Sequence, residues 1–179
     1  MEKIVRVIHY LNQFFAQVGG EEMGGVGPGV KKGAVGPGRV LQQALGDRGE
    51  VVATLFCGDN YFAENQEKAI EELLQYAALS DPDLLIAGPA FEAGRYGVAC
   101  GAICRAAQER LGIAAVSGME EGNAGAALFR KSVYIINSGS SVARMAPILQ
   151  RMSALGIKLA QGAPVGKPEE AGYIPRGIK

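Results

Sequence analysis

Five short runs of apolar and β-branched residues alternate with helical patterns, and this alternation limits the possible folds more than any other feature of the chain. The runs cover residues 3–9, 51–57, 83–87, 113–117 and 133–137. They are almost continuously apolar, as is typical of strands that are covered on both faces. Between them, apolar residues recur at helical spacing over residues 70–77, 99–106 and 142–160. The pattern predicts an α/β fold with an open, mostly parallel five-stranded sheet and helices on both faces, of the flavodoxin or Rossmann type.

Two stretches rich in glycine and proline interrupt this alternation of strand and helix patterns. Residues 19–38 hold nine glycines and two prolines in twenty positions. At that density we expect a long irregular loop without helix or strand. Residues 162–179 have a similar composition and are typical of a tail or linker. We therefore predict one α/β domain over residues 1–161 that includes the glycine-rich loop 19–38, followed by a tail or linker over residues 162–179.

Composition excludes several classes of function. The 179 residues include 18 basic and 18 acidic ones, and this zero net charge argues against nucleic acid as a partner. No apolar run approaches the roughly 18 residues of a membrane span, and the first residues lack a signal-peptide profile. We expect a cytoplasmic protein. Three cysteines without a CxxC motif, together with one histidine, predict neither a disulfide framework nor a metal site.

The carboxyl ends of parallel strands are where such sheets place their ligands, so polar residues directly after a run are the site candidates. The second run ends in or is followed by five of them: Cys57, Asp59, Asn60, Tyr61 and Glu64. The structural alternative is that Asp59 or Asn60 caps a helix and that Cys57 is a small buried hydrophobe. The sequence leaves both interpretations open.

Arg95 and Tyr96 follow the third run, close to the expected start of a helix. The free N–H groups of a helix N-terminus favour anions, and a planar guanidinium binds a carboxylate through two parallel hydrogen bonds. We favour this anion-binding role for Arg95 over an ion pair with Glu92.

Three other residues are candidates on weaker grounds. His9, the single histidine, stands at the end of the first run and is a candidate catalytic residue; a lone histidine is more often a structural one. Glu21 and Glu22 form a carboxylate pair in the glycine-rich loop, either solvated or placed over the site.

Several motifs together resemble a known family. They are HYLNQFF followed by GGEE, then GAVGPG, CGDNYF-x-EN, AGPAF-x-AGRYGVACG and finally GYIPRG. In this order and spacing they are similar to the amino-terminal half of selenoprotein B, the substrate-specific component of the glycine, sarcosine and betaine reductases of amino-acid-fermenting anaerobes.

The resemblance implies the reductive deamination of a small amino acid or an N-methylated glycine. In the family, a carbonyl group of a partner subunit helps to activate the amine, and a selenocysteine attacks the α-carbon. The resemblance also implies further reductase-complex subunits as partners and a homo- or hetero-oligomeric assembly. The family's selenocysteine lies beyond the GYIPRG segment, so the nucleophile is expected outside this chain.

Three interpretations result. In the first, Arg95 holds a substrate carboxylate, Asp59, Glu64 or Glu22 faces the ammonium group, and Tyr61 or Tyr96 walls the pocket. Asn60 is a further substrate-binding candidate. In the second, the chain is a non-catalytic binding or assembly subunit. In the third, Cys57 is the nucleophile of an independent thiol enzyme, which a Cys57 pKa near 8.5 or above would argue against.

Overall fold

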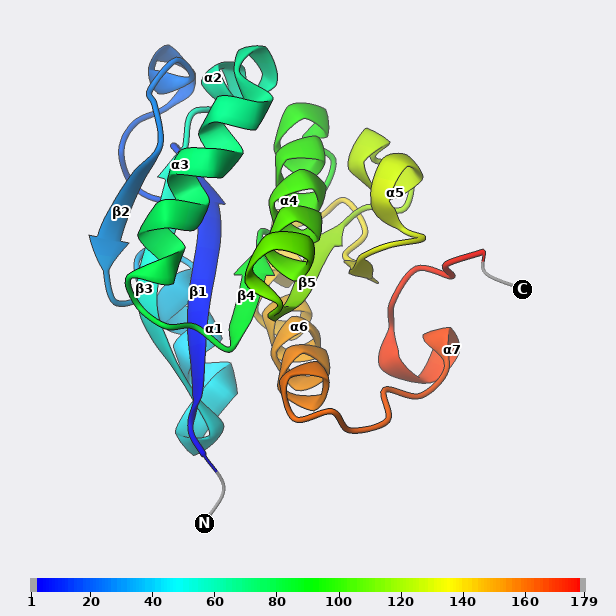
Figure 1. Ribbon diagram of the computed structural model, residues 1–179. Helices are drawn as coiled ribbons and strands as arrows, with labels where there is room; N and C mark the ends of the chain where they lie inside the picture. The colour runs from blue at the N-terminus through cyan, green and yellow to red at the C-terminus, as the bar shows by residue number, and fades with distance from the viewer. Residues whose placement is uncertain (1–2, 178–179) are drawn as a thin grey trace.

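One six-stranded sheet forms the centre of the molecule in a computed structural model, which describes residues 3–177 (Figure 1). The strands are β1 (Val5–Asn12), β2 (Gly29–Lys32), β3 (Gly49–Cys57), β4 (Leu84–Ala87), β5 (Ala114–Met119) and β6 (Tyr134–Asn137). Their order across the sheet is β2-β3-β1-β4-β5-β6. All neighbours pair in parallel except β2, which pairs antiparallel with β3. The α/β fold of flavodoxin or Rossmann type is thus confirmed.

Helices cover both faces of this sheet (Figure 1). They are α1 (Gly38–Leu45), α2 (Asp59–Glu64), α3 (Gln66–Ala78), α4 (Gly94–Ala106), α5 (Ala124–Phe129), α6 (Met145–Ala160) and the short α7 (Pro168–Ala171). Buried side chains from α2, α3, α4 and α5 form one core with the sheet. Those of α1 and α6 form a second core on the opposite face. The helical periodicities of the sequence correspond to α3, α4 and α6.

The strand order places a crevice at one point of the sheet. The chain passes from β1 to β3 on one side and then crosses to β4 on the other side of β1. The strands that follow β1 in the sequence are therefore added first on one side of it and then on the other. In such sheets the carboxyl ends of the strands at this reversal point form a crevice. Here the crevice lies where β1, β3 and β4 end.

The glycine-rich segment is more ordered than its composition indicates. We expected no strand in residues 19–38, and that prediction is wrong, because Gly29–Lys32 forms β2 and makes the sheet six-stranded. Gly29 itself permits the pairing: a Cβ at this position would collide with the Phe56 ring of β3. The glycine content that indicated an irregular loop therefore includes the residue that lets β2 pair beside the Phe56 ring.

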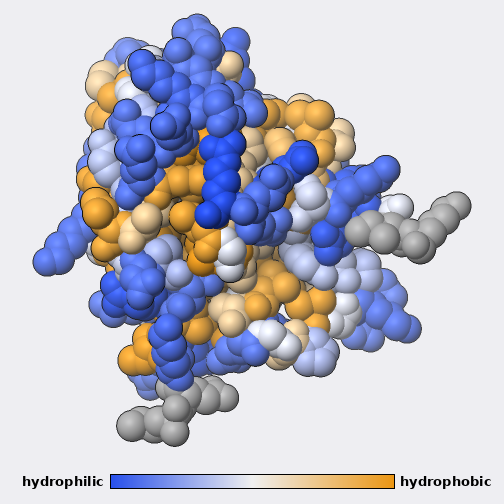
Figure 2. Space-filling view, in the orientation of Figure 1, coloured by the Kyte–Doolittle hydropathy of each residue, from blue (hydrophilic) through white to orange (hydrophobic). Residues whose placement is uncertain are grey.

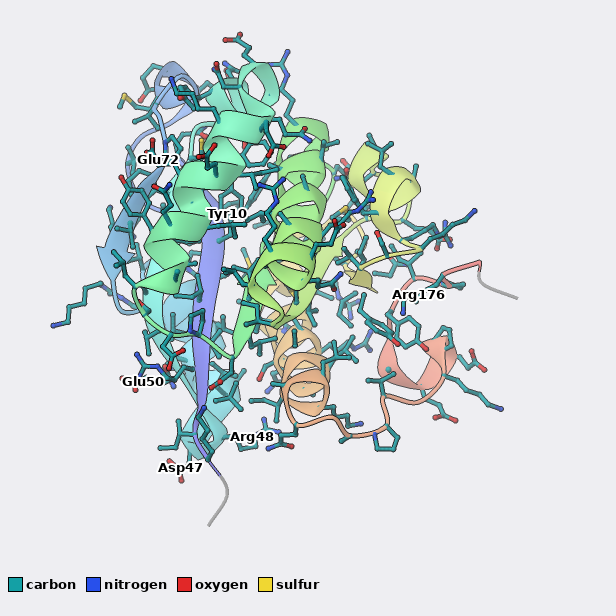
Figure 3. The ribbon with its side chains drawn as sticks, in the orientation of Figure 1. Tyr10, Asp47, Arg48, Glu50, Glu72 and Arg176 are labelled. Carbon is teal, nitrogen blue, oxygen red and sulfur yellow. The ribbon has the colours of Figure 1, made fainter. Side chains whose placement is uncertain are left out.

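The chain after α6 folds back onto the sheet. Tyr173 forms an antiparallel bridge with Ile136 of β6, and Ile174 is buried in the core. Arg176 of this segment is labelled in Figure 3. Its guanidinium lies over the Tyr134 ring at 4.2 Å from the ring centroid. The predicted division at residue 161 stays a prediction. No helix in the described part of the chain is long and apolar enough to cross a membrane.

Candidate binding site

A cleft of about 460 Å³ opens at the carboxyl edge of the sheet, between the starts of α2 and α4. This edge is the upper one in Figure 1, and the surface there is mainly hydrophilic (Figure 2). The residues lining the cleft come from four chain segments: Gln13, Glu21, Gly24, Asp59, Asn60, Ala93, Gly94, Arg95 and Tyr96. Five of the candidate residues from the sequence therefore line one cleft: Glu21, Asp59, Asn60, Arg95 and Tyr96.

Asp59 supplies the acidic side of the cleft. It is the first residue of α2, and its backbone N–H donates to Oε1 of Gln13 at 3.1 Å. Its Oδ2 accepts a hydrogen bond of 3.0 Å from Nδ2 of Asn12, the last residue of β1. Burial raises the pKa of Asp59 above its ordinary value, while the Asn12 bond and the charge of Arg95 act in the opposite direction. The end of β1 thus holds the half-buried Asp59 in place at the start of α2.

Arg95 supplies the basic side of the cleft. It lies in the first turn of α4, a helix of 13 residues, and its side chain is exposed. One guanidinium nitrogen donates to Oδ1 of Asn60 at 2.5 Å. The remaining N–H donors of Arg95 are free to meet an anion, and the N-terminus of α4 favours negative charge at the same place. The cleft therefore combines a carboxyl group with a guanidinium.

The glycine-rich segment forms the outer wall. The carbonyl oxygen of Gly24 accepts from the N–H groups of Asn60 and Tyr61 at 2.9 and 3.0 Å. The N–H of Gly58 donates to the carbonyl oxygen of Val26 at 2.8 Å. A Cβ on Gly58 would collide with the Gly24 carbonyl, so glycine at position 58 lets the two segments approach. The expected irregular loop is thus anchored to the start of α2.

Three buried oxygen atoms lie behind the cleft lining without a hydrogen-bond partner among residues 3–177. They are the hydroxyls of Tyr10 and Tyr96 and Oδ1 of Asp59. Leaving such a group unpaired costs about 1–3 kcal/mol, so native structures contain few of them. All three atoms are closed off from solvent, and Tyr10 is not part of the cleft lining.

The two predicted catalytic residues do not line the cleft. The thiol of Cys57 is buried, and burial, with Asp59 and Glu72 nearby, raises its pKa to about 12. His9 lies on the other face of the sheet, toward Gly38 at the start of α1. Its Nε2–H donates to the carbonyl oxygen of Gly88 at 2.7 Å, and burial lowers its pKa to about 4. At neutral pH the thiol is protonated and the imidazole is neutral, which does not favour catalysis by either group.

Three further predicted residues lie outside the cleft lining. Tyr61 packs beside Gly27 in the glycine-rich segment. Glu64 is exposed at the end of α2. Glu22 is exposed and accepts a hydrogen bond of 2.9 Å from the Gly20 N–H; the backbone bonds lower its pKa. Glu21, the other member of the carboxylate pair, lines the cleft instead.

Sequence reasoning missed Gln13, Gly24 and Tyr10. Gln13 directly follows β1, so the rule that favoured Asp59 and Arg95 could have found it. Tyr10 lies inside an apolar run and resembles an ordinary core residue. Gly24 joins the site through backbone contacts, which leave no signal in a residue pattern. Among the residues that the structure describes, no three histidine, cysteine or acidic side chains gather as metal ligands.

Comparison with known proteins supports the family resemblance that the sequence motifs indicate. The family model of glycine/sarcosine/betaine reductase selenoprotein B matches residues 4–179. The chain belongs to this family. It is 51% identical to the glycine reductase complex component B subunit gamma of Carboxydothermus hydrogenoformans, over 97% of this chain and 40% of the relative.

Two other relatives of the selenoprotein B family carry different substrate names. The sarcosine reductase complex component B subunit beta of Peptoclostridium acidaminophilum is 48% identical over 99% of this chain and 41% of the relative. The betaine reductase complex component B subunit beta of the same organism is 37% identical over 96% of this chain and 39% of the relative. The chain thus spans about 40% of the length of these relatives. No solved structure matches it.

Proposed function

We propose that this chain forms the substrate-binding part of a glycine, sarcosine or betaine reductase component B. The observation that carries the proposal is the presence of Asp59 and Arg95 in one cleft at the crevice of the sheet. A small amino acid at neutral pH carries one ammonium and one carboxylate group. The two side chains match these charges, with Arg95 on the carboxylate and Asp59 on the ammonium group.

The nucleophile of the reaction has to come from outside these 179 residues. Burial raises the pKa of all three cysteines, Cys57, Cys100 and Cys104, so none offers a thiolate at neutral pH. In this proposal a selenocysteine outside these 179 residues supplies the nucleophile, and the name of the matching family, a selenoprotein, supports that choice. In this proposal the described residues bind and orient the substrate, and a partner carbonyl group meets its amine.

Substitution of Arg95 tests the proposal. In isothermal titration calorimetry with glycine, sarcosine and betaine, we expect saturable binding of at least one of them to the unaltered chain. Arg95→Ala should weaken that binding about tenfold or more, because a charge-assisted hydrogen bond is lost. Arg105→Ala is the matched control, since Arg105 is exposed on the same helix and pairs with Glu109.

Two results would contradict the assignment. Unchanged affinity in Arg95→Ala would remove Arg95 from the carboxylate site. Absence of saturable binding by all three compounds would favour the alternative, a non-catalytic subunit that contributes to the assembly of the complex.

A further inference from the structure

Helix α5 exposes apolar side chains that the rest of the described chain leaves uncovered. Its six residues read AGAALF and include no polar or charged side chain. Three of them are buried, and the other three, Ala124, Ala127 and Leu128, are exposed. Leu128 is 63% exposed. A helix that is hydrophobic on every side is normally buried, so the outer face of α5 is suited to a contact as well.

The apolar character of α5 differs from that of α3, which covers the same face of the sheet. Helix α3 presents the charged residues Glu67, Lys68 and Glu71 to solvent. Over α5, Figure 2 shows hydrophobic surface instead. Val98 of α4 is partly exposed, and its backbone packs against Gly125 of α5. We refer to Val98, Ala124, Ala127 and Leu128 together as the α5 surface. A contiguous exposed apolar surface marks a site of interaction.

Charged residues border the α5 surface. Glu120 and Glu121 precede the helix and Lys131 follows it, and all three are exposed. Oε2 of Glu121 lies 3.7 Å from Nη2 of Arg130. An apolar centre with a polar border is the arrangement found in interfaces between proteins.

The relatives contain a polypeptide large enough to cover the α5 surface. The matched part is 40% of the glycine reductase subunit gamma of Carboxydothermus hydrogenoformans and 41% of the sarcosine reductase subunit beta of Peptoclostridium acidaminophilum. The part of each relative outside the match is therefore longer than this chain. A polypeptide of that length forms a core of its own and has ample surface for an interface.

The end of the described chain lies beside the same helix. The Arg176 guanidinium donates to the carbonyl oxygen of Lys131 at 2.9 Å, and Gly177 lies next to the Lys131 side chain. Lys131 follows the end of α5 by two residues. A polypeptide that continued from Gly177 would thus start beside α5. At the other end of the helix, Asn123 donates to the carbonyl oxygen of Ala93, which lines the cleft.

We infer that the α5 surface is the docking site for the part of component B that lies outside the region matched by this chain. Leu128 forms the centre of this contact, and the charged residues around α5 form its border. The docked part stands beside the wall of the cleft that Ala93 and Gly94 form. The inference concerns α5 alone and does not depend on which ligand the cleft binds.

Thiol labelling tests whether the α5 surface is covered. The three native cysteines are buried, so Leu128→Cys introduces a thiol that N-ethylmaleimide labels selectively in the 179-residue chain. In component B assembled with this chain, we expect labelling at position 128 to be about tenfold slower or more, because the centre of an interface excludes solvent. Leu79→Cys is the matched control, since Leu79 is 84% exposed directly after α3 and should react equally fast in both. Mass spectrometry of the two peptides measures the rates.

Cross-linking of a border lysine identifies what covers the surface. Lys131 is exposed beside α5, so an amine-reactive cross-linker can reach it in assembled component B. We expect the peptide joined to Lys131 to come from the part of component B outside the matched region. Lys68 of α3 is the control and should not be joined to that part.

A charge substitution tests the contribution of Leu128 to the contact. An unpaired carboxylate is unfavourable in an apolar contact. Leu128→Asp should therefore accelerate hydrogen exchange of the α5 amides in assembled component B about tenfold or more. It should leave the urea midpoint of the 179-residue chain unchanged, because the side chain is exposed there. Leu79→Asp should change neither quantity.

Three results would overturn the inference. The first is equal labelling of Leu128→Cys in the chain alone and in component B. The second is protection in the chain alone that grows with its concentration, which would assign the surface to a second copy. The third is a cross-link from Lys131 to a different subunit of the complex. None of these measurements uses the cleft, so a failure of glycine, sarcosine and betaine to bind would overturn the proposed function and leave the docking site standing.

Discussion

The imidazole of His9 is enclosed between the sheet and the start of α1, where burial disfavours its protonated, charged form. Because a carbonyl oxygen only accepts, the bond to Gly88 places the proton of the neutral ring on Nε2. Nδ1 then faces Gly38 and has no partner among the described residues. Burial lowers the pKa from 6.5 to about 4. The folded protein therefore binds one proton fewer than the unfolded chain between these two pH values.

This difference predicts acid-sensitive stability. Above pH 6.5 both states are neutral at His9, and as the pH falls toward 4 the unfolded state takes up the proton first, so the free energy of unfolding decreases. The pKa difference corresponds to a loss of roughly 3 kcal/mol over the whole window. Urea unfolding at pH 7.0 and 4.5 should show most of this loss in the unaltered protein, and His9→Gln should lack that part.

NMR checks the same prediction directly. The chain has one histidine, so its imidazole signal is unambiguous. An apparent pKa near 6.5 in the folded protein would contradict the buried, neutral state.

The residues of the site differ in how far the sequence predicts them. Asp59 and Arg95 could be found because they follow strands, and the sheet brings strand ends together. His9 satisfies the same rule, but its side chain points to the other face, and strand ends do not reveal which face that is. Tyr10 could not be found, because its unpaired hydroxyl depends on the neighbours that α2 and α4 bring to it.

At the scale of elements, α4 and α5 meet through small residues. A Cβ on Gly125 would collide with the backbone of Gly97, and one on Gly97 would collide with Asn123. Asn123 caps α5 by accepting from the Gly125 N–H at 2.8 Å, and its amide donates to the carbonyl oxygens of Phe91 and Ala93. The loop before α4, which carries part of the cleft, is thus tied to the start of α5.

Gly125→Ala should therefore destabilise the protein by about 1–3 kcal/mol, because the new methyl group meets backbone that cannot rotate away. Gly94→Ala is the matched control: it also lies at the start of a helix, and no atom within 4 Å would meet its Cβ. That substitution should be neutral or slightly stabilising. Urea unfolding measures both. Equal stability of the two variants would contradict the close contact between α4 and α5.

The strands show which parts of the sheet can be predicted from local sequence patterns and which cannot. The five parallel strands are apolar runs, and each was predictable as such because burial on both faces leaves a local signal. β2 has no such signal, since GVKK is short and two of its four residues are lysines. It is a strand because Gly29 fits against Phe56 of β3, a contact between residues 27 positions apart, and local composition does not contain it.

At the scale of the whole molecule, the segment after α6 belongs to the packing of the sheet. Ile174 is 1% exposed, and its N–H donates to the carbonyl oxygen of Ile135 in β6 at 2.8 Å. The Tyr173 and Tyr134 rings pack edge to face at 5.0 Å. The Arg130 side chain also donates to the Pro175 carbonyl oxygen at 2.7 Å.

Ile174→Ala should accordingly cost about 2–4 kcal/mol of unfolding free energy, as expected for a buried aliphatic side chain. Val142→Ala is the control, because Val142 is 53% exposed and its truncation should change stability by less than about 0.5 kcal/mol. Chemical denaturation of both variants tests whether the folded unit extends past residue 161. A loss below about 1 kcal/mol in Ile174→Ala would mean that this segment is only loosely attached.

The two edge strands of the sheet determine whether another chain can pair with it. A long free strand at a rim offers a row of N–H and C=O groups on which another chain can grow. Here one rim is the four-residue β2, which carries Lys31 and Lys32, and the other is shielded where Tyr173 bridges to Ile136. Sheet extension into fibrous aggregates is therefore discouraged at both ends. The surfaces that remain for contact with another chain are helices and loops, such as those that surround the cleft.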